Sequence, residues 1–341
     1  MDNAGIVAVL SHYPVGTVEK VIPARGGEMN DNWFVDTDRG RYFLRRRSTF
    51  FTPESIDFEL DLIEHLMAVG FPTAPLIHTV DGARRLEYEG RYWELYGFVE
   101  GEPFQVENLA QTRSAAELLA RFHQAVANYQ PRGEVPLDRR VDLQQAERMI
   151  DEFEAELTAG AGALERVLAV PFLRFFRRQA KLVLAGSQSV ADAPPTLIHG
   201  DFQPTNVLFR GDEAVALLDF GDASLFHRAY DVARAILRFA TLRPGYRGQT
   251  DMAPRLDRAR AHTFAEAYQE AHPLSDAERK AIPALLRGAY LIDVSFFLEK
   301  ETSPLKQIAW LIHAWRFTCW LDGSEGTLLT FLGIQLKVVP H

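Results

Sequence analysis

The amino-acid sequence predicts an α+β fold with two lobes: a small antiparallel β lobe that carries one helix, followed by a large, mainly helical lobe. Apolar residues alternate with period two through much of the N-terminal third, which is typical of strands. After Glu100-Gly101 they recur at helical spacing. The chain of 341 residues is also longer than an average single domain. We therefore expect an N-terminal lobe at 1–98 and a C-terminal lobe at 99–341.

The N-terminal lobe is expected to form an antiparallel sheet of about five strands with one helix. The turn signals Asp38-Arg39-Gly40 and Asp81-Gly82 separate runs of alternating residues. The helix is expected to begin at Pro53, after the N-cap Thr52, and to end at Gly70. Strands are expected within 17–24, 32–37, 42–46, 76–80, 86–89 and 92–98.

The C-terminal lobe is expected to be mainly α-helical, with one short sheet inserted. Pro194-Pro195 interrupts the helical pattern, and short strands are expected at 196–199, 206–209 and 214–220, with a turn at Gly211-Asp212. Amphipathic helices are expected at 112–129, 142–158, 165–186, 229–242, 254–271, 276–300 and 303–320.

Composition excludes several classes of protein. Lys and Arg total 37 against 46 Asp and Glu, a net charge of −9, which is the wrong sign for a nucleic-acid binder. The apolar stretch from Val170 to Gly186 is interrupted by basic residues, so no membrane span is expected. A single cysteine, Cys319, cannot form an intramolecular disulfide, and the N-terminus lacks a signal-peptide pattern. We expect a cytoplasmic protein.

Two neighbouring segments carry the chemistry. His199 to Leu208 reads HGDFQPTNVL, and LLDFGDA follows about ten residues later. Asp201, Asn206 and Asp219 lie at or near strand ends and offer three oxygen ligands, which suits Mg²⁺, a cation that prefers oxygen donors and substrate phosphates. The chemistry that such a set serves is phosphoryl transfer.

The motifs HGDFQPTNVLF and LLDFGDA resemble the catalytic and metal loops of the superfamily of aminoglycoside phosphotransferases, choline kinases and homoserine kinases, relatives of the protein kinases. The resemblance implies a bilobal, protein-kinase-like fold with ATP and Mg²⁺ as cofactors. It further implies that Asp201 is the catalytic base, that Asn206 and Asp219 are metal ligands, and that His199 organises the loop. Asp231 matches a family position at which a carboxylate braces the catalytic loop by accepting backbone amides.

A cation that grips the ATP phosphates is expected in the small lobe, together with a helix carboxylate that orients it. Glu59 lies on the apolar face of the predicted helix and needs a partner there. Phe43 and Arg45 share one face of a strand, and the resemblance implies Arg45 as the phosphate-gripping residue paired with Glu59. Arg46 or Arg47 takes this role if the register is shifted. The alternative is that the three arginines form a solvated strand edge.

Two further segments are candidates for nucleotide binding. The adjacent Gly26 and Gly27 can turn backbone amides toward phosphate, although a hairpin turn also explains them. The segment Leu95 to Gly101 resembles the family's hinge. This implies that backbone groups near Tyr96 and Phe98 bind the adenine edge of ATP.

The acceptor is expected to be a small molecule. Only eleven residues separate Asp219 from Asp231, too few for the long activation segment with which protein kinases bind peptides. The later helices are expected to wall the acceptor pocket, and their acidic and aromatic residues suggest a cationic or amino-bearing alcohol, although core packing is an alternative role for the tryptophans. These residues are Asp293, Glu299, Glu301, Trp310, Trp315 and Trp320.

We therefore predict transfer of the γ-phosphate of ATP to a hydroxyl group of an amino alcohol, an amino sugar or an aminoglycoside-like compound. Two alternatives remain at this point: an atypical protein Ser/Thr kinase of the same fold, and a nucleotide-binding pseudokinase that acts as a scaffold. His123 is expected to be a satisfied core histidine rather than a ligand. The oligomeric state does not follow from the sequence.

Overall fold

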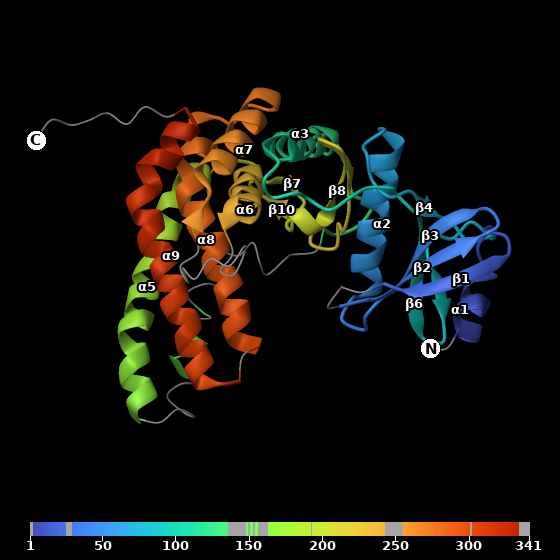
Figure 1. Ribbon diagram of the computed structural model, residues 1–341, viewed down its shortest axis with the longest axis horizontal. Coiled ribbons are helices and arrows are strands. Elements are labelled where there is room, and N and C mark those ends of the chain that lie inside the picture. Colours follow the sequence, from blue (N-terminus) through green and yellow to red (C-terminus); the bar gives the residue numbers. More distant parts are fainter. Residues whose placement is uncertain are drawn as a thin grey trace, which may run out of the picture. The chain divides into compact units, whose positions relative to one another are not determined.

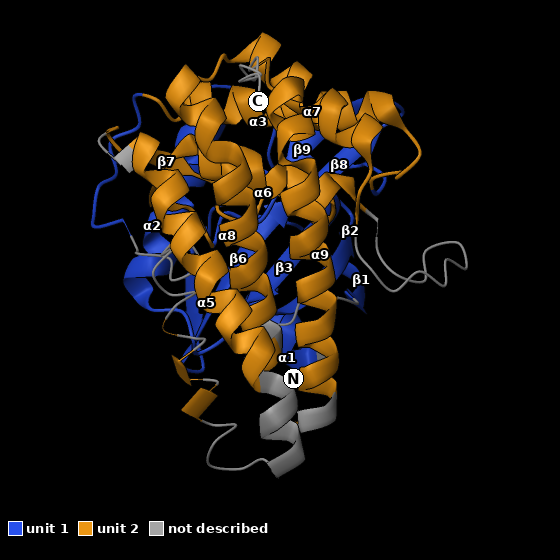
Figure 2. Cartoon of the chain, turned by 90° about the vertical axis from the view of Figure 1, so that its left-hand side faces the viewer, with its two compact units in different colours: residues 1–103, 128–136, 207–221 blue, residues 104–127, 137–206, 222–341 orange. Residues whose placement is uncertain are grey.

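The protein is described from a computed structural model, which covers residues 3–24, 29–135, 148, 151–152, 154–155, 163–191, 193–242, 255–300 and 302–333. The chain divides into two compact units (Figure 2). Unit 1 comprises residues 1–103, 128–136 and 207–221, and unit 2 comprises residues 104–127, 137–206 and 222–341. The expected lobe boundary near residue 98 stays a prediction.

Unit 1 is built on a six-stranded antiparallel sheet (Figure 1). Its strand order is β1-β2-β3-β6-β4, and β5 also pairs with β6. The register places Phe34 opposite Phe43, Phe43 opposite Tyr96, and Arg45 opposite Glu94. The strands are β1 (Val18–Pro23), β2 (Asp31–Thr37), β3 (Gly40–Arg46), β4 (Leu76–Ile77), β5 (Leu86–Tyr88) and β6 (Arg91–Gly97).

Helices contribute to unit 1 on both faces of this sheet. Helix α1 (Asn3–Leu10) packs Ile6 and Val9 into one core with Trp33 and Leu44. This helix was not expected, because its residues show no polar face that would mark an amphipathic helix. Helix α2 (Pro53–Ala68) was expected, and Thr52 Oγ1 caps it by accepting a hydrogen bond from the Ser55 amide.

The hairpin of β8 (Val207–Arg210) and β9 (Glu213–Leu217) also belongs to unit 1. The Phe209 and Glu102 backbones exchange hydrogen bonds, and the Leu217 amide donates to the Pro72 carbonyl. Strand β4 ends earlier than expected. The hydroxyl of Thr79 accepts from the Ala83 amide and closes a turn, so the chain leaves the sheet there.

Unit 2 is mainly helical. Helix α8 packs against α5, α6 and α9, and α3 packs against α7. Asp257 caps α7, which explains why that helix begins after the expected residue 254. The expected helix at 142–158 lies largely outside the described residues. The helices are α3 (Leu109–Ala125), α5 (Ala163–Ala191), α6 (Arg228–Ala240), α7 (Arg258–Ala271), α8 (Asp276–Lys300) and α9 (Pro304–Phe331).

Short elements complete unit 2. Strand β7 (Thr196–Ile198) pairs with β10 (Ser224–Phe226), and β11 (Thr241–Leu242) pairs with β12 (Arg255–Leu256). A 3-10 turn, η2, spans Pro204–Asn206. In the described part of the chain, no helix combines the length and apolar character needed to cross a membrane.

Candidate active site

In unit 1, a buried carboxylate on α2 is shared between Arg45 of β3 and Arg47, which directly follows the end of that strand. Glu59 is 2% exposed. Its Oε2 lies 2.7 Å from Arg47 Nη2, and its Oε1 lies 3.5 Å from Arg45 Nη1. The expected pair of Arg45 and Glu59 is thus present, but Arg47 is the closer partner. Because residues two apart on a strand share a face, both arginines reach α2.

Arg47 belongs to a closed polar network that sequence reasoning did not identify. Its Nε donates to Glu94 Oε1 at 2.6 Å, and the Tyr96 hydroxyl donates to Glu94 Oε2 at 2.7 Å. Burial raises the pKa of Glu59, although both arginines oppose this. Burial also disfavours the charged form of Arg47, but Glu59 and Glu94 hold the pKa of Arg47 well above its usual value. The sequence did hold a signal for this network: Glu94 is an acidic residue at a position of β6 whose side chain faces inward.

Asp219 lies beside Arg45 in unit 1. Asp219 Oδ1 is 3.6 Å from Arg45 Nη1, and the side chains are 49% and 13% exposed, respectively. The backbone of Asp219 is in the left-handed region, with φ of 64°, a conformation that Asp tolerates better than most residues. A Cβ on Gly221 would lie 3.4 Å from Glu59 Oε2. The segment therefore turns tightly against the Arg45–Glu59 pair.

In unit 2, three side chains anchor the carboxylate of Asp201. Gln203 Nε2 donates to Asp201 Oδ2 at 2.6 Å, and Asn206 Nδ2 donates to the same oxygen at 3.2 Å and to the Asp201 carbonyl at 2.9 Å. Arg234 Nη2 donates to Asp201 Oδ1 at 3.2 Å. The expected Asp201 and Asn206 are thus neighbours, whereas Gln203 and Arg234 were missed.

A buried carboxylate holds the loop that carries Asp201. Asp231 accepts the His199 amide at 2.8 Å and the Gly200 amide at 3.1 Å, as expected. Burial favours the neutral form of Asp231, but the hydrogen bond with His123 and the charges of His123 and His199 lower its pKa. His123 Nε2 lies 3.2 Å from Asp231, and its Nδ1 lies 2.7 Å from the Tyr268 hydroxyl. His123 is therefore a satisfied core histidine, as predicted.

Ion pairs extend from Asp201 along α6. Arg234 Nη1 donates to Asp293 Oδ1 at 3.2 Å, and Arg238 Nη2 donates to the same oxygen at 2.9 Å. Burial disfavours the charge on Arg234, but Asp293, Tyr230 and Asp201 raise its pKa. Asp293 was expected in an acidic acceptor wall, yet two cations accompany it. The two arginines, four positions apart on α6, were the signal that sequence reasoning overlooked.

The other residues of the expected acceptor wall are placed only in part. Trp315 is 40% exposed and meets Phe172 of α5 edge-on, with 6.2 Å between ring centroids. Trp320 stacks on Phe317 at 6.0 Å, and Trp310 meets His313 at 5.6 Å. These contacts favour the packing alternative for the tryptophans. Glu301 lies outside the described residues, and so does the side chain of Glu299.

The expected nucleotide-binding backbone is only partly described. The Phe98 amide donates to the Arg41 carbonyl at 3.2 Å, and the Phe98 ring lies under the Arg41 guanidinium at 4.7 Å. Tyr96 is buried with its hydroxyl on Glu94. Gly26 and Gly27 lie outside the described residues. Adenine binding at Tyr96 and Phe98 stays a prediction.

The donor atoms of Asn206 and Asp219 fit Mg²⁺. Both hydrogen bonds of the Asn206 amide use Nδ2, so no described residue donates to its Oδ1. Asp219 offers a half-exposed carboxylate. The described residues contain no cluster of three or more His, Cys, Asp or Glu side chains suited to a metal. Mg²⁺ in phosphoryl-transfer sites is commonly held by one or two carboxylates together with substrate phosphates, so the oxygen atoms that each of these residues offers within its own unit suit this ion.

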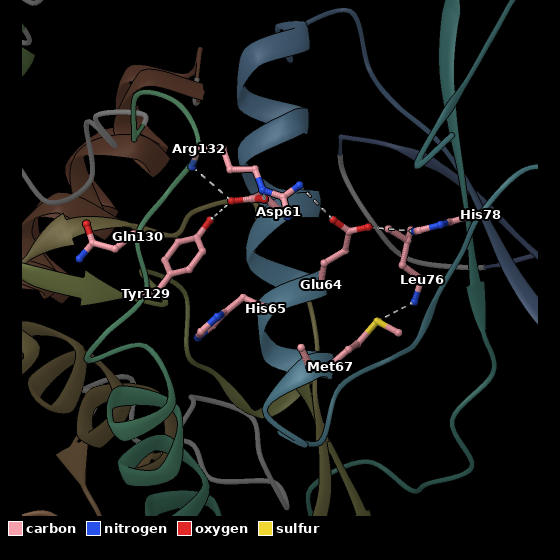
Figure 3. Close-up of a pocket in the computed structure, with 10 residues that line it drawn as sticks. Asp61, Glu64, His65, Met67, Leu76, His78, Tyr129, Gln130 and Arg132 are labelled. Carbon is pink, nitrogen blue, oxygen red and sulfur yellow. Dashed lines mark hydrogen bonds and ion pairs between the residues drawn. The ribbon is translucent and has the colours of Figure 1, made fainter. Parts of the chain in front are cut away.

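A hollow of about 740 Å³ lies against α2 in unit 1 (Figure 3). Asp61, which is 6% exposed, accepts from the Tyr129 hydroxyl at 2.7 Å and pairs with Arg132 Nε at 3.0 Å. Figure 3 shows Tyr129 and Arg132 converging on this carboxylate from the segment opposite α2. The segment 128–136 is thereby tied to the helix that carries Glu59.

Known proteins with similar sequences include phosphotransferases and kinases. The model of the phosphotransferase enzyme family matches residues 20–274. A homoserine kinase of Methylocella silvestris is 30% identical over 292 residues, which cover 85% of this chain and 84% of that protein.

Solved structures share the fold. A microcompartment-associated aminopropanol kinase superposes with a TM-score of 0.68 at 18% identity, over 97% of this chain and 99% of the other. A spectinomycin phosphotransferase, in complex with ADP and spectinomycin, superposes with a TM-score of 0.63 at 12% identity, over 96% and 99% of the two chains. At these identities the likeness concerns the fold alone, and it confirms the predicted α+β architecture.

Proposed function

This chain belongs to the phosphotransferase enzyme family and is a small-molecule kinase with a hydroxyl acceptor, and we propose that it uses ATP and Mg²⁺, with Asp201 as the catalytic base. The observation that carries the proposal is the anchoring of Asp201. Its carboxylate is held by Arg234, Gln203 and Asn206, and its loop by Asp231. A base that is fixed before substrate binds loses little free energy in reaching the reactive geometry.

In the proposed reaction, the acceptor hydroxyl oxygen forms a bond to the γ-phosphorus of ATP. The bond from that phosphorus to the bridging oxygen breaks, and ADP leaves with the electron pair. Asp201 accepts the hydroxyl proton. The guanidinium of Arg45 binds the phosphates, and Glu59 orients it from α2. Asp219 and Asn206 are the proposed ligands of Mg²⁺, which neutralises phosphate charge when bound.

A small acceptor is favoured over a peptide by the segment that follows Asp219. Strand β10 begins at Ser224 and α6 begins at Arg228. These elements occupy most of the chain up to Asp231. They leave no room for an activation segment of the protein-kinase type.

The first experiment measures ADP formation by the purified protein with ATP and Mg²⁺. Homoserine is the first acceptor to test, because the 30% identical relative bears the name homoserine kinase, followed by aminopropanol and spectinomycin. Asp201→Asn keeps the shape of the side chain and is expected to lower kcat by about 10²- to 10⁴-fold. Chelation of Mg²⁺ by EDTA is expected to stop turnover, and added Mg²⁺ to restore it.

Nucleotide binding provides the control for folding. Asp201→Asn is expected to bind ATP with Mg²⁺ as the unsubstituted protein does, since Asp201 touches the acceptor rather than the nucleotide in this mechanism. Undiminished turnover in this variant would remove Asp201 from the role of base.

A further inference from the structure

We propose that Asn32 is a positioning residue for Arg45, and that its side-chain oxygen holds the Arg45 guanidinium in place when ATP is bound. The inference rests on the proposed role of Arg45 in binding the ATP phosphates and adds a second residue to that role. It starts from two buried polar atoms in the sheet of unit 1 that have no hydrogen-bond partner among the described residues.

The two residues are neighbours across the sheet. Asn32 of β2 lies directly opposite Arg45 of β3 in the antiparallel register. Residues in this relation point to the same face of a sheet, and their Cβ atoms are about 4.5–5.5 Å apart. Arg45 projects from that face to reach Glu59 of α2. The side chain of Asn32 therefore lies on the face that carries the proposed phosphate site.

Each residue holds a polar atom that the other can satisfy. Asn32 Oδ1 is buried and accepts no hydrogen bond from a described residue. Arg45 Nε is buried and donates none to a described residue. Burial of an unpaired donor or acceptor is unfavourable. A hydrogen bond from Arg45 Nε to Asn32 Oδ1 satisfies both atoms at once.

The carboxamide of Asn32 is oriented by a neighbouring residue. Asn32 Nδ2 donates to the Asn30 carbonyl at 3.2 Å, and Asn30 Oδ1 in turn accepts from the Ser48 amide at 3.0 Å. These bonds connect the start of β2 to the chain that follows β3. Because Nδ2 faces the Asn30 carbonyl, Oδ1 is directed away from it and is the atom left to accept from Arg45.

The present contacts of Arg45 leave its guanidinium loosely held. Arg45 Nη1 lies 3.5 Å from Glu59 and 3.6 Å from Asp219, whereas charge-assisted hydrogen bonds are typically about 2.7–2.9 Å long. When Nε donates to Asn32, the two terminal nitrogens stay available for one phosphate group, the bidentate arrangement that guanidinium groups favour. Asn32 thus fixes the rotation of the guanidinium, which contacts through a single nitrogen do not.

A neutral acceptor suits this position in the sheet. An aspartate at residue 32 would also accept from Arg45 Nε, but its negative charge would repel the ATP phosphates. Asn32 supplies the acceptor oxygen without that charge.

Calorimetric titration of the full chain with ATP and Mg²⁺ tests the inference. Asn32→Leu keeps the approximate shape of the side chain and removes the acceptor oxygen. We expect it to raise the Kd for ATP about tenfold and to leave the Kd for adenosine, which has no phosphates, unchanged. In turnover assays, the KM for ATP should rise while the KM for the acceptor alcohol stays the same. Asn32→Ser, with a shorter acceptor, should give intermediate values.

A double-mutant cycle shows whether Asn32 acts through Arg45. If it does, Asn32→Leu should raise the Kd for ATP no further once Arg45→Met is present. Losses that multiply would mean that the two residues act independently, and they would overturn the inference. Equal losses for ATP and adenosine in Asn32→Leu would assign Asn32 a structural role and overturn it as well.

Asp31→Ala is the matched control on the same strand. Asp31 is the adjacent residue of β2, so its side chain points to the other face, where it pairs with Arg46 at 2.7 Å. This variant should leave the Kd for ATP unchanged. Chemical denaturation without nucleotide checks folding, and Asn32→Leu should unfold at nearly the same denaturant concentration as the unsubstituted protein.

These measurements separate a failure of the inference from a failure of the proposed function. Coupling between Asn32 and Arg45 in ATP binding supports the inference even if Asp201→Asn turns over normally. Kinase activity of the unsubstituted protein, together with an unchanged Kd for ATP in Asn32→Leu, overturns the inference and leaves the proposed function intact.

Discussion

Arg45 of β3 and Arg47, which directly follows that strand, both reach Glu59 but are held differently. Arg47 is 1% exposed and lies between two buried carboxylates, at 2.7 Å from Glu59 and 2.6 Å from Glu94. Arg45 is more exposed, and its contacts with Glu59 and Asp219 are longer, at 3.5 and 3.6 Å. The short buried contacts suit a structural role for Arg47, whereas the longer contacts of Arg45 are compatible with its proposed role in binding phosphate.

Substitution separates these two roles. Arg47→Met leaves Glu59 and Glu94 buried with less compensation, and we expect it to lower the free energy of unfolding by about 3–5 kcal/mol. Arg45→Met is expected to change stability far less and to raise the KM for ATP at least tenfold. Chemical denaturation and steady-state kinetics measure the two effects.

Arg46 provides the matched control on the same strand. Its ion pair with Asp31 is 2.7 Å long but lies on the exposed side, with Asp31 52% exposed. Exposed ion pairs contribute about 1 kcal/mol or less, so Arg46→Met should alter neither quantity much. A loss of stability in Arg45→Met equal to that in Arg47→Met would contradict the division of roles.

At the level of elements, the placement of α2 depends on a segment distant in sequence. Tyr129 and Arg132 bind Asp61, two residues after Glu59 on the same helix. Burial, the hydrogen bond to Asp61 and the charge of Asp61 raise the pKa of Tyr129, so its hydroxyl stays protonated and donates at neutral pH. The segment 128–136 therefore fixes the helix from which Glu59 orients Arg45.

Tyr129→Phe tests this link by removing one hydroxyl. We expect a loss of about 1 kcal/mol in the free energy of unfolding and a rise of a few-fold in the KM for ATP, with kcat little changed. Tyr88→Phe is the control, because the Tyr88 hydroxyl makes no hydrogen bond to a described residue. A stability loss without any change in the KM for ATP would limit Tyr129 to a structural role.

Helix α6 combines two tasks on one of its faces. Asp231 braces the loop of Asp201, and Arg234, one turn later, binds the carboxylate of Asp201 itself. Arg238 follows one further turn along and reaches Asp293. Residues three and four apart lie side by side on a helix. One element therefore positions both the loop and the carboxylate of Asp201, the proposed base.

For the molecule as a whole, Asp231 links stability to pH. The pKa of Asp231 is lowered in the folded protein from an ordinary value of 3.8. A carboxyl group whose pKa is lower when folded stabilises the protein above its unfolded pKa. This stability is lost as the pH falls below about 3.8 and through the folded pKa.

Thermal unfolding between about pH 2 and pH 6 measures this contribution, because the loss begins near the unfolded pKa and continues below it. The unsubstituted protein should lose stability steeply toward the acid end. Asp231→Asn should be less stable at pH 6, because it cannot accept both loop amides as an ionised carboxylate does, and its stability should change less with pH. Burial raises the pKa of Glu278, but its hydrogen bonds and its attraction to Arg228 together outweigh this, so the pKa is lowered overall. Glu278 therefore adds the same dependence of stability on pH to both proteins. If the stability of the two proteins falls in parallel as the pH is lowered, the acid sensitivity is due to groups other than Asp231.

Much of the fold and part of the site could be predicted from the sequence. The expected start of α2 at Pro53 and the bonds from the His199 and Gly200 amides to Asp231 are confirmed. These features rest on local chemistry: a capping hydroxyl, a proline at the first helical position, and a loop motif of contiguous residues. Helix α1 escaped prediction because an almost wholly apolar helix has no periodic signal.

The sequence by itself determined the α+β class and the family, because both depend on residue type and short spacing. Only the tertiary structure decided how charges pair. Arg47 finds Glu94 at a separation of 47 residues, and Arg234 finds Asp293 at 59. Such partners are selected by packing, since a buried charge is stable only beside a compensating one. The same packing places Arg234 and Arg238 beside Asp293, one member of the expected acidic acceptor wall.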